Sequence, residues 1–361
     1  MPAAASTTTT TTILRRALLY GSSSPYPFRN SLPHHPPTNI SPLPVPASSP
    51  KFLTSSRNIP SVDSVVYDLE DSVSTTEKPR ARDAVAEILT RPRVPGIREQ
   101  GVRINSVDSG MALSDLEVVL KAPHIDTVVV PKVDSASSLT FITDVLRHLL
   151  PLRHSTTTSS SPPIRILALI ESARALHSLA EICSATPYLS GLILGGDDLA
   201  TSLRLPSPLS PSHPTLLAAR TQVLLAARAF AVPSAIDVVC TAYRTPPPSA
   251  TSGVAHPVNE ELAAECAEGR RIGFDGKQVV HPSQVGVAQE AFAPGSEEVR
   301  WAVEVVRGAE AAEREGKGAT VVRGRMVDRP VVERARGVVE RARACGVDVE
   351  GGELGGGATT G

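Results

Sequence analysis

Short apolar runs alternate with longer segments of helical periodicity along most of the chain. We expect strands at 65–69, 102–104, 127–130, 166–169, 192–194, 234–239 and 276–280, with 18–20 as an eighth. Between them, apolar residues recur every three to four positions, which predicts helices at about 77–89, 112–121, 137–150, 214–230 and 259–270. A capping box, Ser74-Thr-Thr-Glu77, is expected to begin the first of these helices. Alternating strands and helices indicate a parallel sheet covered by helices.

Two fold classes have this alternation. Eight strand–helix units in roughly 250 residues match a (β/α)8 TIM barrel. The alternative is a doubly wound open sheet, which normally carries a Gly-rich phosphate-binding loop after its first strand. No such loop follows the first strand here. The sequence therefore favours the α/β TIM barrel.

Composition divides the chain into segments. Residues 1–62 contain no Asp or Glu and are rich in Ser, Thr and Pro, which fits either an organellar transit peptide or a disordered tail. After the last expected strand, helices at about 297–315 and up to 344 flank a strand-like run at 319–322, and this C-terminal extension is long enough to fold over its own barrel or a neighbouring one. The expected organisation is a disordered or targeting segment at 1–12, a barrel at 13–290 with a Pro-rich insertion at about 22–47, a lid extension at 291–345 and a disordered tail at 346–361.

Bulk composition excludes several classes of partner. The 361 residues are 41% hydrophobic, enough for a large core, and the net charge of −1 gives no attraction to nucleic acid or an anionic membrane. Aromatic residues make up only 3%, leaving few side chains to stack on bases. No apolar stretch reaches the roughly 18 residues of a membrane span. The four cysteines show no metal-ligand spacing, so we interpret them as buried thiols.

The most informative residues are acidic and follow two apolar runs. Glu171 lies in Ile170-Glu-Ser172, and Asp198 lies in Gly195-Gly-Asp-Asp-Leu199. Because neighbouring parallel strands lie roughly 4.8 Å apart, adjacent strands would bring these two carboxylates together at their carboxyl ends. Mg²⁺ suits such a site, since it takes one or two carboxylates and completes its octahedron with water and substrate oxygens. The pattern predicts a metal-dependent enzyme.

Other ionisable residues also follow predicted strands. Asp68, Glu70, Asp71, Arg103 and Lys132 all lie at or just beyond a strand's carboxyl end. A single acidic residue there is more often a helix cap than a ligand. A whole set on one rim is better explained by the active site of a barrel, which is built at that face. We expect the three acidic residues of this set to orient metal-bound water and Arg103.

These motifs resemble a known family. Tyr67-Asp-Leu-Glu-Asp-Ser-Val73, Val102-Arg-Ile-Asn-Ser106, Val130-Pro-Lys-Val133 and the two acidic motifs resemble the citrate lyase β-subunit-like proteins of the HpcH/HpaI aldolase/citrate lyase superfamily. Phe274-Asp-Gly-Lys-Gln-Val-Val-His-Pro282 and Gly324-Arg-Met-Val-Asp328 extend the resemblance, which covers about residues 13–345. The chain is most similar to the mitochondrial citramalyl-CoA lyase branch, which retains the C-terminal extension.

The resemblance implies a TIM barrel that forms a homotrimer and binds Mg²⁺ and a CoA thioester. The matching positions make Glu171 and Asp198 the metal ligands and Arg103 the arginine that binds substrate. Asp328 matches the catalytic acid/base, which in relatives reaches a neighbouring subunit's site. Ile236 and Asp237 match positions that line the substrate pocket. His281 is expected to be structural.

One segment departs from the family pattern. Relatives continue from the first strand through Val-Pro-Gly to a lysine-bearing helix that holds the CoA phosphates. Here Tyr20 is followed by Gly21-Ser-Ser-Ser and a Pro-rich stretch, so Lys51 is the expected counterpart of the first CoA lysine, and Arg57 is the candidate replacement for a second. The insertion is either a long surface loop beside the site or an error of the gene model.

The implied reaction is reversible cleavage of a carbon–carbon bond in a 3-hydroxyacyl-CoA. Citramalyl-CoA or malyl-CoA would give acetyl-CoA and a 2-oxo acid. One alternative is a metal-dependent pyruvate aldolase that needs no CoA, and another is a non-catalytic relative with a disrupted CoA site. The expected location is the mitochondrion, otherwise the cytoplasm.

Overall fold

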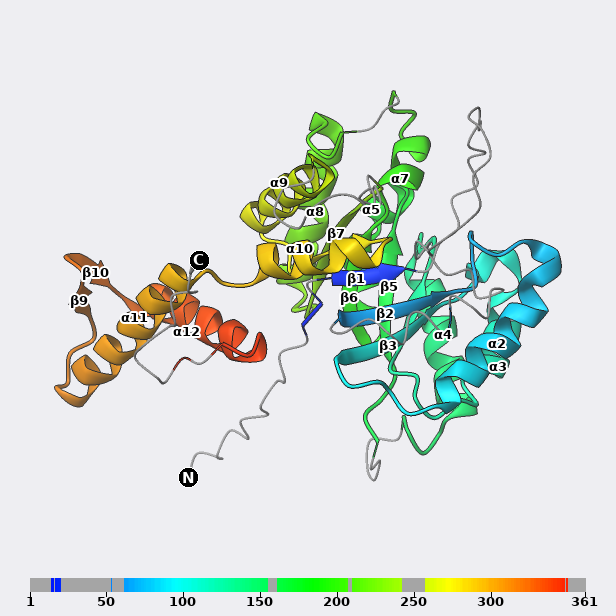
Figure 1. The fold of residues 1–361 in the computed structure, drawn as a ribbon, viewed down its shortest axis with the longest axis horizontal. Helices are drawn as coiled ribbons and strands as arrows, with labels where there is room; N and C mark the ends of the chain where they lie inside the picture. The colour runs from blue at the N-terminus through cyan, green and yellow to red at the C-terminus, as the bar shows by residue number, and fades with distance from the viewer. Residues whose placement is uncertain are drawn as a thin grey trace, which may run out of the picture. The chain divides into compact units, whose positions relative to one another are not determined.

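The computed structural model describes residues 14–15, 17–20, 53, 62–154, 161–206, 210–241, 257–347 and 349. Within these ranges the chain divides into two compact units, one over Arg15–Glu290 and the other from Ala291 onward (Figure 1). Each unit has its own hydrophobic core. The predicted segment at 1–12, the insertion at about 22–47, Lys51 and Arg57 lie outside the described residues, as does the predicted tail at 346–361 apart from residues 346, 347 and 349.

The first unit is a closed barrel of eight parallel strands in sequence order. The strands are β1 (Ala17–Tyr20), β2 (Val62–Asp68), β3 (Ile97–Arg103), β4 (Thr127–Val130), β5 (Arg165–Ile170), β6 (Leu189–Leu194), β7 (Ala235–Cys240) and β8 (Gly276–Val279). Leu18 closes the barrel, because it lies opposite Ser64 of β2 and Gln278 of β8. The TIM-barrel prediction is confirmed, including the eighth strand, and the open-sheet alternative is wrong.

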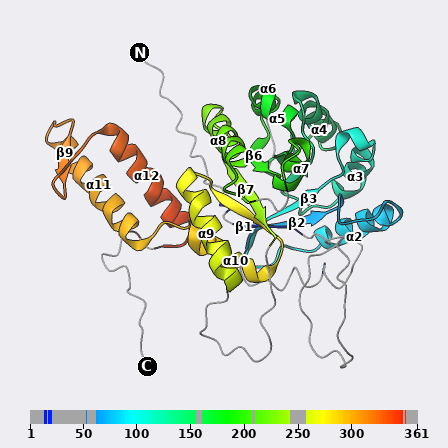
Figure 2. The same ribbon diagram turned by 90° about the horizontal axis from the view of Figure 1, so that it is seen from above.

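Helices surround the barrel (Figure 2). They are α2 (Lys78–Thr90), α3 (Ala112–Val119), α4 (Ala136–Leu149), α5 (Ala173–His177), α6 (Leu179–Ser184), α7 (Gly196–Ser202), α8 (Pro214–Ala229), α9 (Pro257–Ile272) and α10 (Pro282–Phe292), with 3-10 turns η1 (Thr75–Glu77) and η2 (Val107–Ser109). None of the described helices has both the length and the apolar character needed to span a membrane.

The predicted capping box at Ser74 is wrong. Ser74 precedes the short turn η1, and its side chain makes no cap hydrogen bond. Its hydroxyl lies 3.3 Å from Thr76 Oγ1 instead. The α-helix begins four residues later, where Glu77 occupies the N-cap position and Pro79 fits the first turn because its missing N–H needs no partner there.

The barrel interior is apolar in its middle. Side chains alternate between the two faces of a strand, so every second residue points inward. The inward-facing cluster consists of Leu18, Val66, Val129, Leu167, Leu169, Ile193 and Ile236. Because this layer is fully packed, chemistry is restricted to the ends of the barrel.

A buried ionic network fills the amino-terminal end. Arg15 is 1% exposed and donates from Nε and Nη2 to the two carboxylate oxygens of Glu99, each at 2.8 Å. Its Nη1 donates to the Ser190 carbonyl and Ser234 Oγ, both at 2.8 Å. Arg15 thus ties the segment just before β1 to strands β3 and β6.

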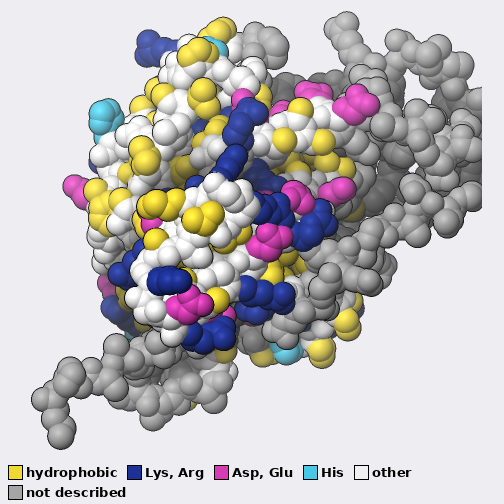
Figure 3. Space-filling view, turned by 90° about the vertical axis from the view of Figure 1, so that its left-hand side faces the viewer, with side chains coloured by type: hydrophobic (Ala, Val, Ile, Leu, Met, Phe, Trp, Pro, Cys, Tyr) yellow, Lys and Arg dark blue, Asp and Glu magenta, His cyan; other side chains and the backbone are white. Residues whose placement is uncertain are grey.

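The second unit consists of α11 (Ser296–Arg314), the hairpin β9 (Thr320–Val322) and β10 (Arg325–Val327), and α12 (Arg329–Ala344). The predicted helices and the strand at 319–322 are confirmed, whereas the pairing strand β10 was missed. Arg323 and Gly324 form the two-residue turn with φ of 48° and 73°, the positive values that tight hairpins need. On the face drawn in Figure 3, basic and acidic side chains are interspersed, in keeping with the small net charge.

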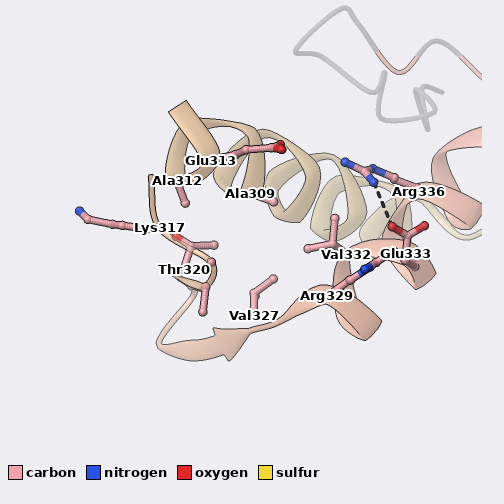
Figure 4. A pocket seen from close by; sticks show the side chains of 12 residues that line it. Ala309, Ala312, Glu313, Lys317, Thr320, Val327, Arg329, Val332, Glu333 and Arg336 are labelled. Carbon is pink, nitrogen blue, oxygen red and sulfur yellow. Dashed lines mark hydrogen bonds and ion pairs between the residues drawn. The ribbon is translucent and has the colours of Figure 1, made fainter. Parts of the chain in front are cut away.

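A pocket lies within this second unit, between α11, the hairpin and α12 (Figure 4). Val327 and Val332 contribute apolar surface, and Arg336 forms an ion pair with Glu333 at 3.0 Å. None of the site residues predicted from sequence is among the residues that line it.

Candidate functional site

The predicted site residues of the barrel gather at the carboxyl ends of β2 to β6. Asp68 ends β2, Arg103 ends β3, and Lys132 comes two residues after β4. Glu171 follows β5 directly, and Asp198 lies in the first turn of α7 after β6. Since all strands are parallel, these ends form one rim of the barrel. The barrel therefore brings these side chains to one end, as the sequence predicted.

The pair of Asp68 and Arg103 forms the rigid part of the site. Arg103 donates from Nε to Asp68 Oδ1 at 2.6 Å and from Nη2 to Oδ2 at 2.7 Å. Asp68 also accepts the amide N–H groups of Glu70 and Ser72. Burial acts to raise the pKa of Asp68, but Arg103 and these hydrogen bonds outweigh it and leave the pKa lowered. Asp68 is thus an ionised group that fixes the orientation of Arg103.

Glu70 connects Arg103 to Lys132. Its Oε2 lies 3.0 Å from Arg103 Nη1, and its Oε1 accepts from Lys132 Nζ at 2.7 Å. Burial raises the pKa of Glu70, with Arg103 opposing this and the charge of Asp71 adding to it. Burial acts to lower the pKa of Lys132, but Glu70 outweighs it, so that pKa is raised. Asp71 is more exposed and lies 3.5 Å from the same ammonium group.

Glu171 has the most strongly perturbed carboxyl group at this rim. It is 5% exposed and its Oε1 accepts the backbone N–H of Lys132 at 2.6 Å. Burial and the charges of Glu70 and Asp198 raise the pKa of Glu171 to about 8. The charges of Glu70 and Asp198 thus disfavour the ionised form of the same carboxyl group. An ionised Glu171 would gain from a cation placed among these groups.

A buried lysine supports the turn after β2. Lys78 Nζ donates to the carbonyl oxygens of Leu69 and Glu70 at 2.8 and 2.9 Å. Its side chain therefore fixes the main chain of the Asp-Leu-Glu-Asp motif through two hydrogen bonds. Sequence reasoning missed this residue because a lysine at the start of a helix normally faces solvent.

The two predicted pocket residues on β7 face opposite sides of the strand. Ile236 belongs to the packed interior layer of the barrel. Asp237 is fully buried on the other side, where Arg220 of α8 donates to its two oxygens at 2.9 and 2.6 Å. Both oxygens of Asp237 are therefore occupied by a partner that the sequence did not suggest.

Three further predicted residues fall in other segments of the chain. Lys51 is not among the described residues. Asp328 belongs to the second unit, where it is exposed and accepts the N–H of Val331 at 3.4 Å as the N-cap of α12. His281 is buried at the start of α10, with Nδ1 2.7 Å from Ser283 Oγ.

The donor set at the rim fits a hard divalent cation. It contains five carboxyl groups, on Asp68, Glu70, Asp71, Glu171 and Asp198, against the two basic side chains of Arg103 and Lys132. Across the described ranges, no three acidic, histidine or cysteine side chains are grouped closely enough to hold a metal by themselves. Carboxylate oxygens in small number are what Mg²⁺ takes from a protein when waters and substrate complete its shell.

Comparison with known proteins defines the class. The family described as HpcH/HpaI aldolase/citrate lyase matches residues 43–282. The chain therefore belongs to the HpcH/HpaI aldolase/citrate lyase family, and the family named from the motifs is confirmed.

Individual relatives match over most of the chain. The citrate lyase subunit beta of Escherichia coli K12 is 34% identical over 87% of this chain and 96% of its own length. The mitochondrial citramalyl-CoA lyase of Rattus norvegicus is 31% identical over 79% of this chain and 81% of its own length. Among solved structures, protein CitE from Mycobacterium tuberculosis, in complex with magnesium, acetoacetate and coenzyme A, has a TM-score of 0.60 and 30% identity over 82% of this chain and 96% of that one. These relatives support a lyase family related to CoA chemistry.

Proposed function

We propose that the protein is a Mg²⁺-dependent carbon–carbon lyase that cleaves or forms a 3-hydroxyacyl-CoA such as citramalyl-CoA or malyl-CoA. The observation that carries this proposal is Glu171, which is held by the Lys132 amide at 2.6 Å among neighbouring carboxyl groups at the barrel rim. Relatives named for citramalyl-CoA lyase activity and a related structure containing magnesium and coenzyme A support it.

In this proposal, Glu171 and Asp198 hold the metal through carboxylate oxygen. When bound, Mg²⁺ supplies Lewis-acid stabilisation for the charge that develops on a substrate oxygen. Arg103 contributes a planar guanidinium group, which suits a substrate carboxylate better than an ammonium group does. Asp68 fixes that guanidinium through two hydrogen bonds, so little reorientation is needed when substrate binds.

The reaction breaks the bond between C2 and C3 of the acyl group. The hydroxyl oxygen on C3 becomes the carbonyl oxygen of the 2-oxo acid, and C2 gains a proton and leaves as acetyl-CoA. Asp328 is the proposed acid/base for this proton exchange, a role that contributes typically 10²–10⁴-fold. This role requires the extension 291–345 to act as a lid, in the proposed homotrimer over a neighbouring subunit. Lys51 is the proposed contact for the CoA phosphates.

We also propose a mitochondrial location, as in the name of the rat relative. The barrel limits where a targeting segment could be removed. Arg15 is buried in the ionic network, and Leu18 of β1 is fully buried between β2 and β8. A protease cut after residue 15 would remove Arg15 from this network, and a cut after β1 would also remove a strand of the barrel. The mature protein should therefore retain Arg15, which N-terminal sequencing of the organellar form would test.

The function is tested by incubating the purified chain with MgCl₂ and either citramalyl-CoA or malyl-CoA. We expect acetyl-CoA and pyruvate or glyoxylate in equal amounts, and loss of activity on chelation with EDTA. Release of free CoA with the hydroxy acid intact would identify thioester hydrolysis instead. Activity on free hydroxy acids alone would favour the CoA-independent aldolase, and no turnover of any substrate would favour the non-catalytic alternative.

A further inference from the structure

Lys132 contacts two carboxylates of the site from opposite ends of one residue. Its backbone N–H donates to Glu171 Oε1 at 2.6 Å, and its ammonium group donates to Glu70 Oε1 at 2.7 Å. It has a φ of 52°, a left-handed conformation that is uncommon for a residue with a side chain. Such strain persists where the surrounding structure requires it, and it concentrates at functional sites.

The two contacts have different consequences. The amide contact survives any substitution that preserves the main chain, so the orientation of Glu171 does not depend on the lysine side chain. The ammonium group instead engages Glu70 and, at 3.5 Å, Asp71. Glu70 and Glu171 are each hydrogen-bonded to this one residue, so Glu70 lies near the proposed metal ligand. The lysine side chain therefore holds Glu70 and Asp71 in ion pairs beside its own contact with the proposed ligand Glu171.

We propose that Lys132 is a positioning residue that reserves Glu70 and Asp71 as ion-pair partners and so limits the metal to its two proposed ligands. Mg²⁺ demands a near-ideal octahedron and usually keeps several positions for water and substrate. Further carboxylates would bind the ion more tightly while occupying positions that the substrate requires. The inference rests on the proposed function. It adds the reason why a Mg²⁺ ion at this acidic rim would keep coordination positions open for substrate.

The proposal predicts opposite effects on metal and substrate. In Lys132→Met the aliphatic length is kept and the positive charge is lost. Calorimetric titration with MgCl₂ in the absence of substrate should then show a Kd about ten-fold lower than wild type, because a neighbouring charge no longer opposes the cation. The KM for the acyl-CoA should rise and kcat should fall. Loss of folding alone would weaken metal binding and could not tighten it.

Three further variants isolate the cause. Adding Glu70→Gln to Lys132→Met removes the released carboxylate, so the Kd for MgCl₂ should return towards the wild-type value. Lys132→Arg keeps the charge and should keep the wild-type Kd. Lys121→Met is the matched control, because Lys121 is an exposed lysine in the connection from α3 to β4, at the other end of the strands. It should change neither metal binding nor turnover.

The outcomes separate this inference from the function on which it rests. If wild-type protein binds no Mg²⁺, the proposed function fails. If wild type binds Mg²⁺ but Lys132→Met binds it equally or more weakly while its melting temperature is maintained, the positioning role is overturned and the function stands. A tighter Kd that persists after the Glu70→Gln addition would likewise overturn the assignment of Glu70 as the released group.

Discussion

Gly195 lies directly against Glu171. A Cβ atom on Gly195 would be 2.7 Å from Glu171 Cβ and 2.7 Å from its Oε2, closer than Cβ atoms approach other atoms in proteins. The glycine is needed here for space, since its φ of −90° is open to any residue. The first glycine of the Gly-Gly-Asp-Asp motif therefore makes room for the carboxylate on the neighbouring strand.

Gly195→Ala should displace the Glu171 carboxylate. We expect Mg²⁺ affinity to fall by about ten-fold or more and the free energy of unfolding to fall by about 1–3 kcal/mol, typical of overpacking. Calorimetric titration and urea unfolding measure these effects. Gly286→Ala is the control, because Gly286 lies in α10 with no atom within 4 Å of an added Cβ. It should stabilise the protein by up to about 1 kcal/mol. Unchanged metal affinity in Gly195→Ala would contradict this account.

The effect of Mg²⁺ on thermal stability should depend on pH. Burial and neighbouring charges raise the pKa of Glu171 to about 8 in the folded protein, so its protonated form is favoured on folding. The associated stability is present below about pH 4.5, the ordinary value for Glu, and is lost as pH rises through 8. A cation needs the ionised form, so the increase in Tm caused by MgCl₂ should grow between pH 6 and 9. Glu171→Gln should abolish both the growth and most of the Mg²⁺ effect.

Asp328→Asn should separate chemistry from folding. Asp328 caps α12, and Asn is about as good an N-cap as Asp, so the melting temperature should change little. If Asp328 exchanges the proton, turnover should fall by about two to four orders of magnitude while Mg²⁺ affinity is kept. Steady-state kinetics and calorimetry on the same preparation test both points. If Asp328→Asn turns over substrate at the wild-type rate, Asp328 has only its capping role.

Arg15→Met should destabilise the barrel strongly. The substitution leaves Glu99 buried without its main partner, and breaking a buried pair in this way costs about 3–5 kcal/mol. Urea unfolding at pH 7 measures the loss. Arg91→Met is the control, because Arg91 pairs with Glu87 at 3.0 Å at the exposed end of α2. Its effect should stay below about 1 kcal/mol. If Arg15→Met lowers the free energy of unfolding no more than Arg91→Met does, the Arg15 network is unimportant for folding.

Acid should destabilise the barrel partly by protonating Glu99. Burial acts to raise the pKa of Glu99, but Arg15, Thr127 and Arg165 outweigh it and lower the pKa to about 2. Its stabilisation, about 3 kcal/mol, is therefore complete above pH 4.5 and is lost as pH falls towards 2. Urea titrations between pH 6 and 3 should show this decline. Glu99→Gln should be less stable at pH 6 and should decline less steeply below pH 4.5.

The local sequence pattern was sufficient to predict much of the fold and of the candidate site. Short apolar runs overlap all eight strands, because strands buried on both faces are rich in apolar residues, although β3 begins five residues before its expected run and is polar at Arg98, Glu99 and Gln100. The position of Glu171 and Asp198 after such runs placed them at one rim, since parallel strands end on the same side. The family followed from motifs at those same strand ends and is confirmed by the match over residues 43–282.

Only the tertiary structure decided which partners the charged residues have. Asp237 pairs with Arg220, 17 residues away on α8, and Arg15 with Glu99 at a separation of 84 residues. No local period encodes such pairs, because they depend on which strands and helices become neighbours after the barrel closes. The left-handed Lys132 is another example: its two ends meet Glu70 and Glu171 only because β2, β4 and β5 converge on the same rim. The strand pattern specified where charged groups are placed, and the closed packing of the barrel determined which of them touch.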